Sequence, residues 1–388
     1  MPTTDFAVIG AGIQGASLAY HLAKAGAGSV TLFERDHPAS GATGFSGALV
    51  RMYYDNETEC RLAFEGFSFF SKWGEVVGGH CGFQPVGVLW MKGPDKLDEL
   101  RAGVAMQQRV GVNTSYLTPD RMVELFPFMR SDGICGAAYE PESGFADPSN
   151  TTNSLVDAAK ALGVDVRLSS RVTELTRDGD RVSGFVVNGE EWSAGLTVVA
   201  AGAWTAKLCA TAGIFVPVRP HRLPAGLVHR PPELPAHTVV IDETLPLWFR
   251  PDLGDRSVIG AEIEPDPYGY DPDGFWPPAK PESLVEVTAL AAQRIPLYEK
   301  ATLGRTWSGI DGFTPDNQQI IGRVPGVEGL QLLCGGNGHG FKVGPAVGKA
   351  LAEVITAGST AITDMSQFDL ARFEGKTEFA RWPGLYGE

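Results

Sequence analysis

One segment near the start constrains the fold of this chain more than any other. Residues 5–10 read as a short apolar strand, residues 15–25 repeat apolar side chains at helical spacing, and residues 30–33 read as a second apolar strand. Strand, helix and strand in this order begin a parallel sheet. The turn between the first strand and the helix consists of Gly10, Ala11, Gly12, Ile13, Gln14 and Gly15.

This turn has the G-x-G-x-x-G spacing that is typical of dinucleotide binding. The glycines permit a tight turn and a close approach of a pyrophosphate to the backbone, while the helix N-terminus supplies free N–H groups. Glu34 ends the second strand, where a carboxylate can accept both ribose hydroxyls and would repel a 2'-phosphate. The pattern predicts a dinucleotide other than NADP and leaves NAD and FAD open; the alternative is a glycine-rich turn followed by an exposed glutamate.

Size and charge limit the class of protein. The chain has 388 residues, of which 43% are hydrophobic, so it is long enough for two domains or one large interleaved one. Its formal net charge of -14 repels nucleic acid and anionic membrane surfaces, so we expect neither as a partner. Small anions remain possible ligands, because a few cations can converge in a cleft.

The cysteines and the apolar runs bear on where the protein acts. The five cysteines are odd in number, widely spread and without zinc-site spacing, which suits reduced thiols in a cytosol. We recognise no signal peptide and no uncharged stretch of the roughly 20 residues that a membrane span needs. We therefore expect a cytoplasmic protein without a metal site, and its oligomeric state stays open.

The middle of the chain mixes two kinds of pattern. Helical periodicity marks residues 60–73, 96–110 and 119–126. Alternating helix and short strands return over residues 148–200, whereas residues 215–312 are rich in proline, aromatics and strand-like runs. The first kind of pattern indicates a resumed parallel sheet, and the second indicates an antiparallel sheet.

We therefore expect an α/β protein of two domains (α+β). A Rossmann-type cofactor-binding domain with a parallel sheet is interleaved with a substrate-binding domain built on an antiparallel sheet. A buried strand over 330–333 and a helix over 342–357 return the chain to the first domain. The expected cofactor-binding domain comprises residues 1–80, 145–215 and 320–388, and the expected substrate-binding domain comprises residues 81–144 and 216–319.

Three further segments carry a family resemblance. SGATGFSG over residues 40–47 is followed by ALVR over 48–51, VVAAGAW covers residues 198–204, and CGGNGHGFKVGP covers residues 334–345. In this order, across nearly the whole chain, these segments resemble the D-amino-acid oxidase superfamily, in particular its glycine oxidase and monomeric sarcosine oxidase branch. The resemblance is more specific for fold and cofactor than for substrate.

The resemblance implies that the dinucleotide is FAD. Main chain at Val172 would bind adenine, and the helix beginning near Lys342 would aim its positive end at the flavin and stabilise the reduced anion. The alternative for the last segment is a plain glycine-rich connection, and His339 is open as a structural residue or as an acid or base. The implied FAD-binding residues are Gly10, Gly12, Ile13, Gln14, Gly15, Glu34, Arg35, Ser40, Ala42, Thr43, Ser46, Gly47, Ala48, Val172, Ala201, Gly202, Trp204, Gly336, Asn337, Gly338, His339, Gly340, Phe341 and Lys342.

The resemblance also implies a clamp for a substrate carboxylate. Arg51 and Lys342 occupy the positions that hold this group in sarcosine oxidase, where a planar guanidinium fork and a point charge fix the acid. The alternative for Arg51 is a cofactor phosphate or a neighbouring carboxylate as its partner. The alternative for Lys342 is a solvated position in the first helical turn.

Other substrate contacts are less sharply defined. Trp248, Phe249, Arg250 and Trp307 are candidates for an apolar pocket beside the flavin ring, although aromatics in a sheet are often core residues. Glu262 falls close to a polar substrate contact of the family, and Tyr53 or Tyr54 is a candidate for the entrance.

The chain departs from the sarcosine oxidase pattern at two places. The cysteine that tethers flavin there falls near Gly309 here, and residues 40–47 lack the histidine used by related dehydrogenases, so we expect non-covalent FAD. The lysine associated with oxygen activation falls near Val258, with no lysine close by. The electron acceptor is therefore oxygen or another molecule.

We expect an enzyme that oxidises a small amino or imino acid. A neutral amine would give hydride from the carbon attached to nitrogen to the flavin N5, leaving an imine, and such chemistry needs orientation more than a strong protein base. The alternatives are a 2-hydroxy-acid dehydrogenase on the same fold and a flavin-binding regulatory protein without turnover.

Overall fold

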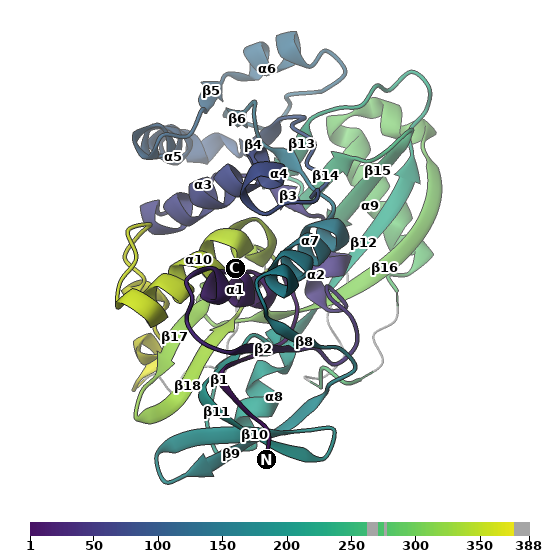
Figure 1. Cartoon of the computed structure of the whole chain (residues 1–388). Helices are drawn as coiled ribbons and strands as arrows, with labels where there is room; N and C mark the ends of the chain where they lie inside the picture. Colours follow the sequence, from purple (N-terminus) through teal and green to yellow (C-terminus); the bar gives the residue numbers. More distant parts are fainter. Residues whose placement is uncertain (262–270, 275–277, 376–388) are drawn as a thin grey trace.

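The computed structural model describes residues 1–261, 271–274 and 278–375, and it arranges them around two eight-stranded sheets (Figure 1). In the first sheet five strands are parallel neighbours in the order β18 (Val327–Cys334), β11 (Glu190–Val199), β1 (Thr3–Ile9), β2 (Val30–Phe33) and β8 (Asp165–Arg167). Antiparallel pairings add β9 (Val172–Asp178), β10 (Arg181–Val187) and β17 (Ile320–Val324).

Both faces of the first sheet are covered, which explains the unbroken apolar run of its central strand. Val8 packs with Leu18, whereas Ala7 and Ile9 pack with Leu208 on the opposite face. The first of these faces carries α1 (Ile13–Lys24), α7 (Pro148–Ala161) and α10 (Gly340–Ala357), and the second carries α8 (Thr205–Ala210). In Figure 1 α1 lies between α10 and α7.

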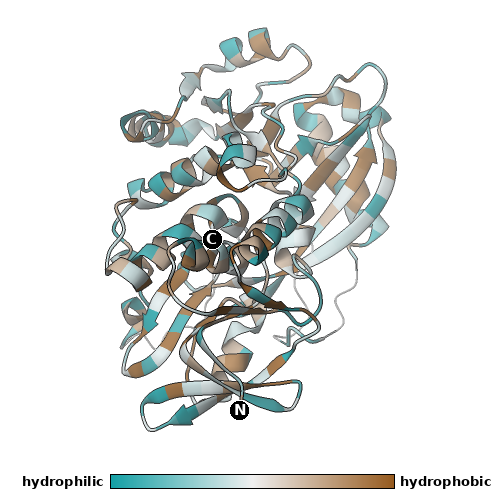
Figure 2. Ribbon diagram, in the orientation of Figure 1, coloured by the Kyte–Doolittle hydropathy of each residue, from teal (hydrophilic) through white to brown (hydrophobic). Residues whose placement is uncertain are grey.

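The second sheet is largely antiparallel and has its own core. Its order is β16 (Thr302–Phe313), β12 (Arg219–His229), β15 (Arg256–Ala261), β14 (Leu247–Pro251), β13 (Val239–Asp242), β4 (Val88–Lys92), β6 (Gly136–Glu140) and β5 (Ser115–Leu117), with β4 and β13 parallel. Helix α9 (Pro281–Arg294) covers one face, where Val287 and Ala291 join Phe249 and Ile259 in one apolar cluster. Figure 2 shows apolar residues, in brown, along strands such as β12 and β15.

The remaining elements connect the two sheets. A short ladder pairs β3 (Leu49–Val50) with β7 (Gly144–Phe145). The other helices are α2 (Ala42–Phe45), α3 (Glu57–Ser71), α4 (Trp73–Val76), α5 (Leu97–Val110) and α6 (Pro119–Leu125), and 3-10 turns cover Pro94–Lys96, Gly202–Trp204, Pro296–Lys300, Ser366–Phe368 and Leu370–Phe373. In the part of the chain that the structure describes, we find no helix with the length and apolarity of a membrane span.

The expected fold class is confirmed, with local corrections. The predicted helix over 60–73 is two helices, because the backbone leaves helical geometry at Lys72. The final helix begins at Gly340, two residues before the predicted start. Helix α9 lies in the region that we read as sheet, and the proline-rich stretch before it hid the helical spacing of its buried residues.

Candidate active site

One cavity is lined by residues of both sheets and of both ends of the chain. Every residue that the family resemblance implies for FAD lines it, except Asn337. Its walls also include residues that the sequence analysis did not single out, namely Trp90, Ser170, Arg171, Thr173, Lys207, Leu208, Thr211, Leu223, Pro224, Ala225, Ile241, Ala261, Asp273, Ile310 and Asp311. Sequences far apart in the chain therefore meet around one elongated space.

The first and the last glycine of the G-x-G-x-x-G turn stand where no side chain fits. Gly10 has a φ of +109°, and a Cβ there would lie 2.4 Å from the carbonyl oxygen of Ala200; a Cβ on Gly15 would lie 2.0 Å from the oxygen of Gly10. The N-cap Gly12 of α1 supplies no side-chain cap, and the first turn carries no acid. The first turn of the helix lines the cavity and suits an anion, although the N–H of Ile13 already donates to the Thr43 hydroxyl at 3.2 Å.

Glu34 is buried rather than exposed, contrary to the alternative considered for it. Its carboxylate accepts hydrogen bonds from the backbone N–H of Ala11 (2.8 Å) and Asp36 (2.9 Å) and from the hydroxyl of Ser40 (3.2 Å). The acid ties the glycine turn to the loop after β2. Oε1 accepts two of these hydrogen bonds, whereas Oε2 accepts one and keeps a lone pair for a hydroxyl in the cavity.

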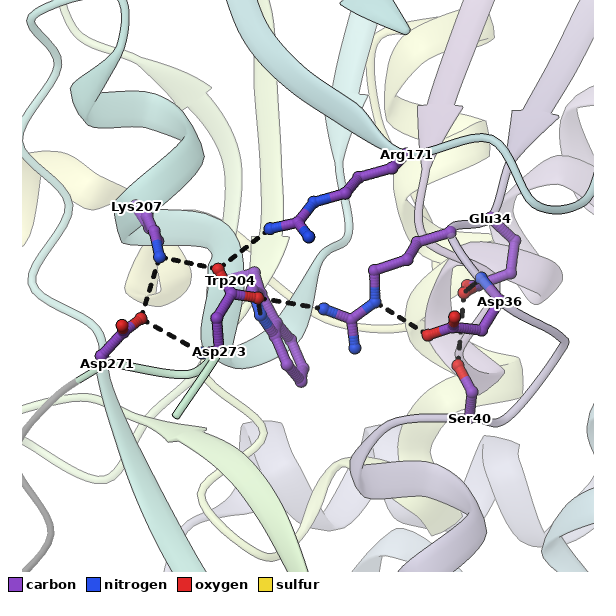
Figure 3. A network of polar contacts seen from close by, with 9 residues as sticks. Glu34, Asp36, Ser40, Arg171, Trp204, Lys207, Asp271 and Asp273 are labelled. Atoms are coloured by element: carbon purple, nitrogen blue, oxygen red, sulfur yellow. Dashed lines mark hydrogen bonds and ion pairs between the residues drawn. The ribbon is translucent and has the colours of Figure 1, made fainter. Parts of the chain in front are cut away.

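An outer cation cluster, consisting of Arg35, Arg171 and Lys207, gathers around Asp273 (Figure 3). Lys207 Nζ lies 2.7 Å, Arg171 3.0 Å and Arg35 3.4 Å from the Asp273 carboxylate, which also accepts from the Trp204 indole N–H at 2.9 Å. Burial opposes ionisation of Asp273, but the hydrogen bonds from Lys207 and Trp204 hold its pKa below the ordinary value. Each cation of the cluster is therefore paired with an acid from another part of the chain, and Arg35 also pairs with Asp36 at 2.9 Å.

The sequence analysis missed most of this cluster. Of its three cations only Arg35 was predicted, together with the neighbouring Trp204, whose ring centre lies 4.2 Å from the Arg35 guanidinium. Asp271 adds a second acid to Lys207 at 2.9 Å. No local pattern reveals contacts of this kind, because Lys207 and Asp273 meet only through the tertiary fold.

The C-terminal glycine loop is held by hydrogen bonds to two side chains, one of them outside the cavity. Asn337, with a φ of 49°, points its buried side chain away from the cavity and accepts from the N–H of Thr314 at 2.8 Å. Asp311 accepts from the N–H of Gly338 and of Gly312, both at 2.8 Å. Burial raises the pKa of this Asp311 carboxyl, which the sequence analysis did not single out.

His339 lies in the same loop and lines the cavity, where it is half-buried. Burial lowers its pKa, and the charges of Lys342 and Arg51 lower it further, so the imidazole is neutral. Its ring meets the Tyr54 ring edge-on at 6.0 Å between centroids. A neutral imidazole fits a packing or hydrogen-bonding role better than that of a charged acid.

Arg51 and Lys342 come together in the cavity, where we refer to them as the inner cation pair. Each is only 4% exposed, and both lie over the ring of Tyr54, at 4.6 Å and 5.2 Å from its centre. Trp90 covers the other side of the Arg51 guanidinium at 4.3 Å, and Arg51 donates to the carbonyl of Tyr53. The solvated position considered for Lys342 is wrong.

Of the candidates for an apolar pocket beside the flavin ring, one lines the cavity and the others lie elsewhere. Trp248 lines the cavity, and a Cβ on Gly47 would lie 2.4 Å from its ring. Phe249, the next residue on the strand, points into the core of the second sheet. Arg250 instead donates to the Gly47 carbonyl at 2.7 Å, and the Trp307 indole donates to the Phe45 carbonyl at 3.1 Å.

Four other expectations have mixed outcomes. Tyr53 and Tyr54 are both buried, so neither flanks an entrance. Gly309 lines the cavity as expected, whereas Val258 is a buried residue of β15 and does not. Glu262 lies outside the described residues.

Comparison with known proteins agrees with this architecture. The family model described as FAD dependent oxidoreductase (DAO) matches residues 5–354. A 4-methylaminobutanoate oxidase (formaldehyde-forming) of Paenarthrobacter nicotinovorans is 31% identical over 379 residues, covering 95% of this chain and 45% of that protein. The mitochondrial sarcosine dehydrogenase of Mus musculus is 28% identical, covering 98% of this chain and 42% of that protein. The chain thus spans less than half the length of these two relatives.

A solved structure matches over its whole length. The L-proline dehydrogenase from P. horikoshii has a TM-score of 0.87 and 27% identity, covering 96% of this chain and 99% of that one. Since the family model covers nearly the whole chain and agrees with the glycine-lined cavity, the chain belongs to the DAO family of FAD-dependent oxidoreductases.

Proposed function

We propose that this chain oxidises a small amino or imino acid with FAD seated along the cavity. The observation that carries the proposal is the inner cation pair: Arg51 and Lys342 are buried together beside the C-terminal glycine loop, with an aromatic floor at Tyr54. Two basic side chains that are buried together without a paired acid form a binding site for an anion, and a substrate carboxylate supplies one.

The residues present fit FAD. The open start of α1 and the glycine turn suit the pyrophosphate, Glu34 suits the ribose hydroxyls, and Val172 lies in the cavity wall where adenine contacts are expected. Residues 40–48 and 336–342 would hold the flavin ring, with the N-terminus of α10 near it. We propose non-covalent binding because Gly309 offers no thiol.

The sheets support the proposed domain division. All eight strands of the first sheet lie within residues 1–80, 145–215 and 320–388, which we assign to FAD. All eight strands of the second lie within residues 81–144 and 216–319, which we assign to the substrate.

The chain's own residues then orient the substrate. Arg51 and Lys342 bind the carboxylate, and Tyr54, Trp90 and Trp248 exclude water and leave an apolar space for the carbon skeleton. The bound flavin supplies the hydride acceptor. The product is an imine, which water hydrolyses outside the site or which remains cyclic when the substrate is an imino acid.

The names of the relatives support an amine substrate. They refer to methylaminobutanoate, sarcosine and proline, each a secondary amine with a carboxylate. The acceptor is oxygen or another electron carrier, and with valine at position 258 we expect slow reaction with oxygen. The five free cysteines support a cytoplasmic location.

Anaerobic reduction tests the proposal. The FAD-loaded protein is titrated with N-methyl, cyclic, D- and L-amino acids and with 2-hydroxy acids while the flavin absorbance is followed, and air is then admitted. We expect bleaching by at least one amino or imino acid. Bleaching by hydroxy acids alone would favour the alternative dehydrogenase, and a protein that stays yellow with every compound would support a regulatory role.

A further inference from the structure

Lys342 has surroundings that are unusual for a lysine. It is the third residue of α10, is 4% exposed, and points into the cavity beside Arg51. Among the residues that the structure describes, no carboxylate lies within 4.0 Å of its Nζ. Lysines are rarely buried in this way unless an acid is paired with them.

Two positive charges near Lys342 make a positive charge on its own amine unfavourable. Arg51 shares the Tyr54 ring with it, and a guanidinium keeps its proton in proteins. The N-terminus of α10 adds the positive end of a helix dipole. Of the two side chains of the inner cation pair, the lysine is therefore the one that can lose its charge.

The nearest acids, Glu140 and Glu59, accept hydrogen bonds from other residues. Glu140 on β6 accepts from the Met52 N–H (2.9 Å), the Gln107 amide (2.6 Å) and the Ser143 hydroxyl (2.6 Å). Glu59 on α3 accepts from the Asn56 amide, and burial raises its pKa. His339 on the adjoining loop is neutral, as is Tyr54, whose pKa burial raises.

These neighbours have one combined effect on Lys342. Burial, and then the charge of Arg51, hold its pKa well below that of an ordinary lysine, and Glu59 and Glu140 oppose this shift without cancelling it. The direction agrees with the geometry, since a desolvated amine next to a fixed cation prefers the uncharged form.

We propose that Lys342 is uncharged in the substrate-free site and takes the ammonium proton of the amino acid as it binds. In this step, which rests on the proposed function, the N–H bond of the substrate ammonium breaks and a new bond forms between that proton and Nζ of Lys342. No electrons change hands. The substrate becomes a neutral amine with a free lone pair, and Lys342 becomes the cation that pairs with its carboxylate.

One event thus completes the clamp and prepares the amine. The arriving carboxylate stabilises a charged Lys342, and the zwitterion carries the proton that this charge requires. A carboxylate without an amine has to draw the proton from water, so its binding weakens as pH rises. A 2-hydroxy acid shares this handicap, which gives the site a preference for amino acids.

Proton counting on the holoenzyme tests the inference. Isobutyrate and 2-aminoisobutyrate have the same skeleton, and neither is oxidised by loss of an α-hydrogen from a carbon attached to nitrogen. Each is added to FAD-loaded protein in weak buffer at pH 8 with a pH indicator, and binding is followed by the flavin spectrum. We expect uptake of about one proton per flavin with isobutyrate and about none with 2-aminoisobutyrate.

Two variants sharpen the count. Lys342→Arg keeps the positive charge but cannot be neutral, so isobutyrate should bind it with about no proton uptake. Lys349→Arg is the matched control: it lies on the same helix, pairs with Glu65 at 2.7 Å, and should leave the uptake unchanged. If Lys342→Arg fails to retain FAD, the wild-type measurement alone still decides.

The outcomes separate this inference from the proposed function. Isobutyrate binding to the wild-type protein without proton uptake, or no binding of isobutyrate at all, would overturn the role of Lys342. Amino acids could still bleach the flavin in that case, and the proposed function would stand. Failure of every amine to bleach the flavin would instead overturn the proposed function.

Discussion

The outer cation cluster and the inner cation pair lie in the same cavity but differ in how their charges are balanced. Arg35, Arg171 and Lys207 have side chains 32–52% exposed, and each forms an ion pair with Asp273. Arg51 and Lys342 are almost fully buried and have aromatic rings, not acids, around them. Solvent-exposed ion pairs contribute little to stability, whereas buried basic side chains without a paired acid remain able to bind an anionic ligand. We therefore assign a structural role to the outer cation cluster and substrate binding to the inner cation pair.

Removing the fixed charge of the inner pair should have the largest effect. Arg51→Met leaves the substrate carboxylate with one partner, and we expect the anaerobic flavin-reduction efficiency to fall about a thousandfold, or about 4 kcal/mol. The flavin spectrum should change little. Stopped-flow reduction measures this loss.

The control for that variant is Arg61→Met. Arg61 lies on the surface of α3 and pairs with Glu57 at 2.7 Å, so its loss should change the reduction efficiency less than twofold. Equal losses in both variants would show that burial of the inner pair has no special role.

The pH dependence of the unfolding free energy should differ between the two regions. His339, which adjoins the inner cation pair, should contribute to it in mild acid. Its pKa is lowered in the folded state, so the unfolded chain binds more protons below about pH 6.5, and stability falls as the pH drops from there. His339→Gln should reduce the slope of the unfolding free energy by up to about 1.4 kcal/mol per pH unit between pH 6.5 and 5.5. Urea unfolding across this range measures the slope.

The exposed His80 provides the comparison for that slope. His80→Gln should leave it unchanged. The outer cluster contributes in a different window: Asp273 has a lowered pKa, so its contribution is present above about pH 3.8 and is lost as the pH falls through the folded value. A slope insensitive to His339→Gln would contradict the neutral state of this imidazole.

Loss of the acid in the outer cluster should have the smallest effect. Asp273→Asn removes the negative charge that pairs with Arg35, Arg171 and Lys207 but keeps an amide oxygen that accepts from Trp204, and we expect the dissociation constant of FAD to rise about threefold. Asp271→Asn removes the second acid beside Lys207, which still pairs with Asp273, and should change it less. Fluorescence titration of the apoprotein measures both.

The readout that separates the regions is the substrate. With FAD saturating, Asp273→Asn should leave the reduction rate and the substrate affinity unchanged. If Asp273→Asn raised the dissociation constant of the substrate as much as Arg51→Met does, the outer cation cluster and the inner cation pair would not be independent.

Features that depend on residues close together in the sequence could be predicted, whereas features that depend on contacts across the fold could not. The glycine turn, α1 and Glu34 are set by neighbours in sequence, so a local pattern sufficed. Asp273 and Asp311 act through contacts between residues far apart in the sequence, and no sequence pattern predicts these contacts. Trp248 and Phe249 alternate on one strand, and sequence alone did not tell which of the two faces the cavity.

The resemblance predicted positions better than roles. It placed Arg51 and Lys342 in one site, which the structure brings together, but it included Asn337, whose side chain holds the loop from behind. A family motif marks residues that are needed near a cofactor, and only the hydrogen bonds tell which of them face it.

A crystal structure of the FAD-loaded protein with isobutyrate bound tests the account most directly. We predict that the carboxylate accepts hydrogen bonds from both Arg51 and Lys342 above the Tyr54 ring, with the flavin ring against residues 336–342. A carboxylate bound elsewhere, or a flavin ring remote from the inner cation pair, would contradict it.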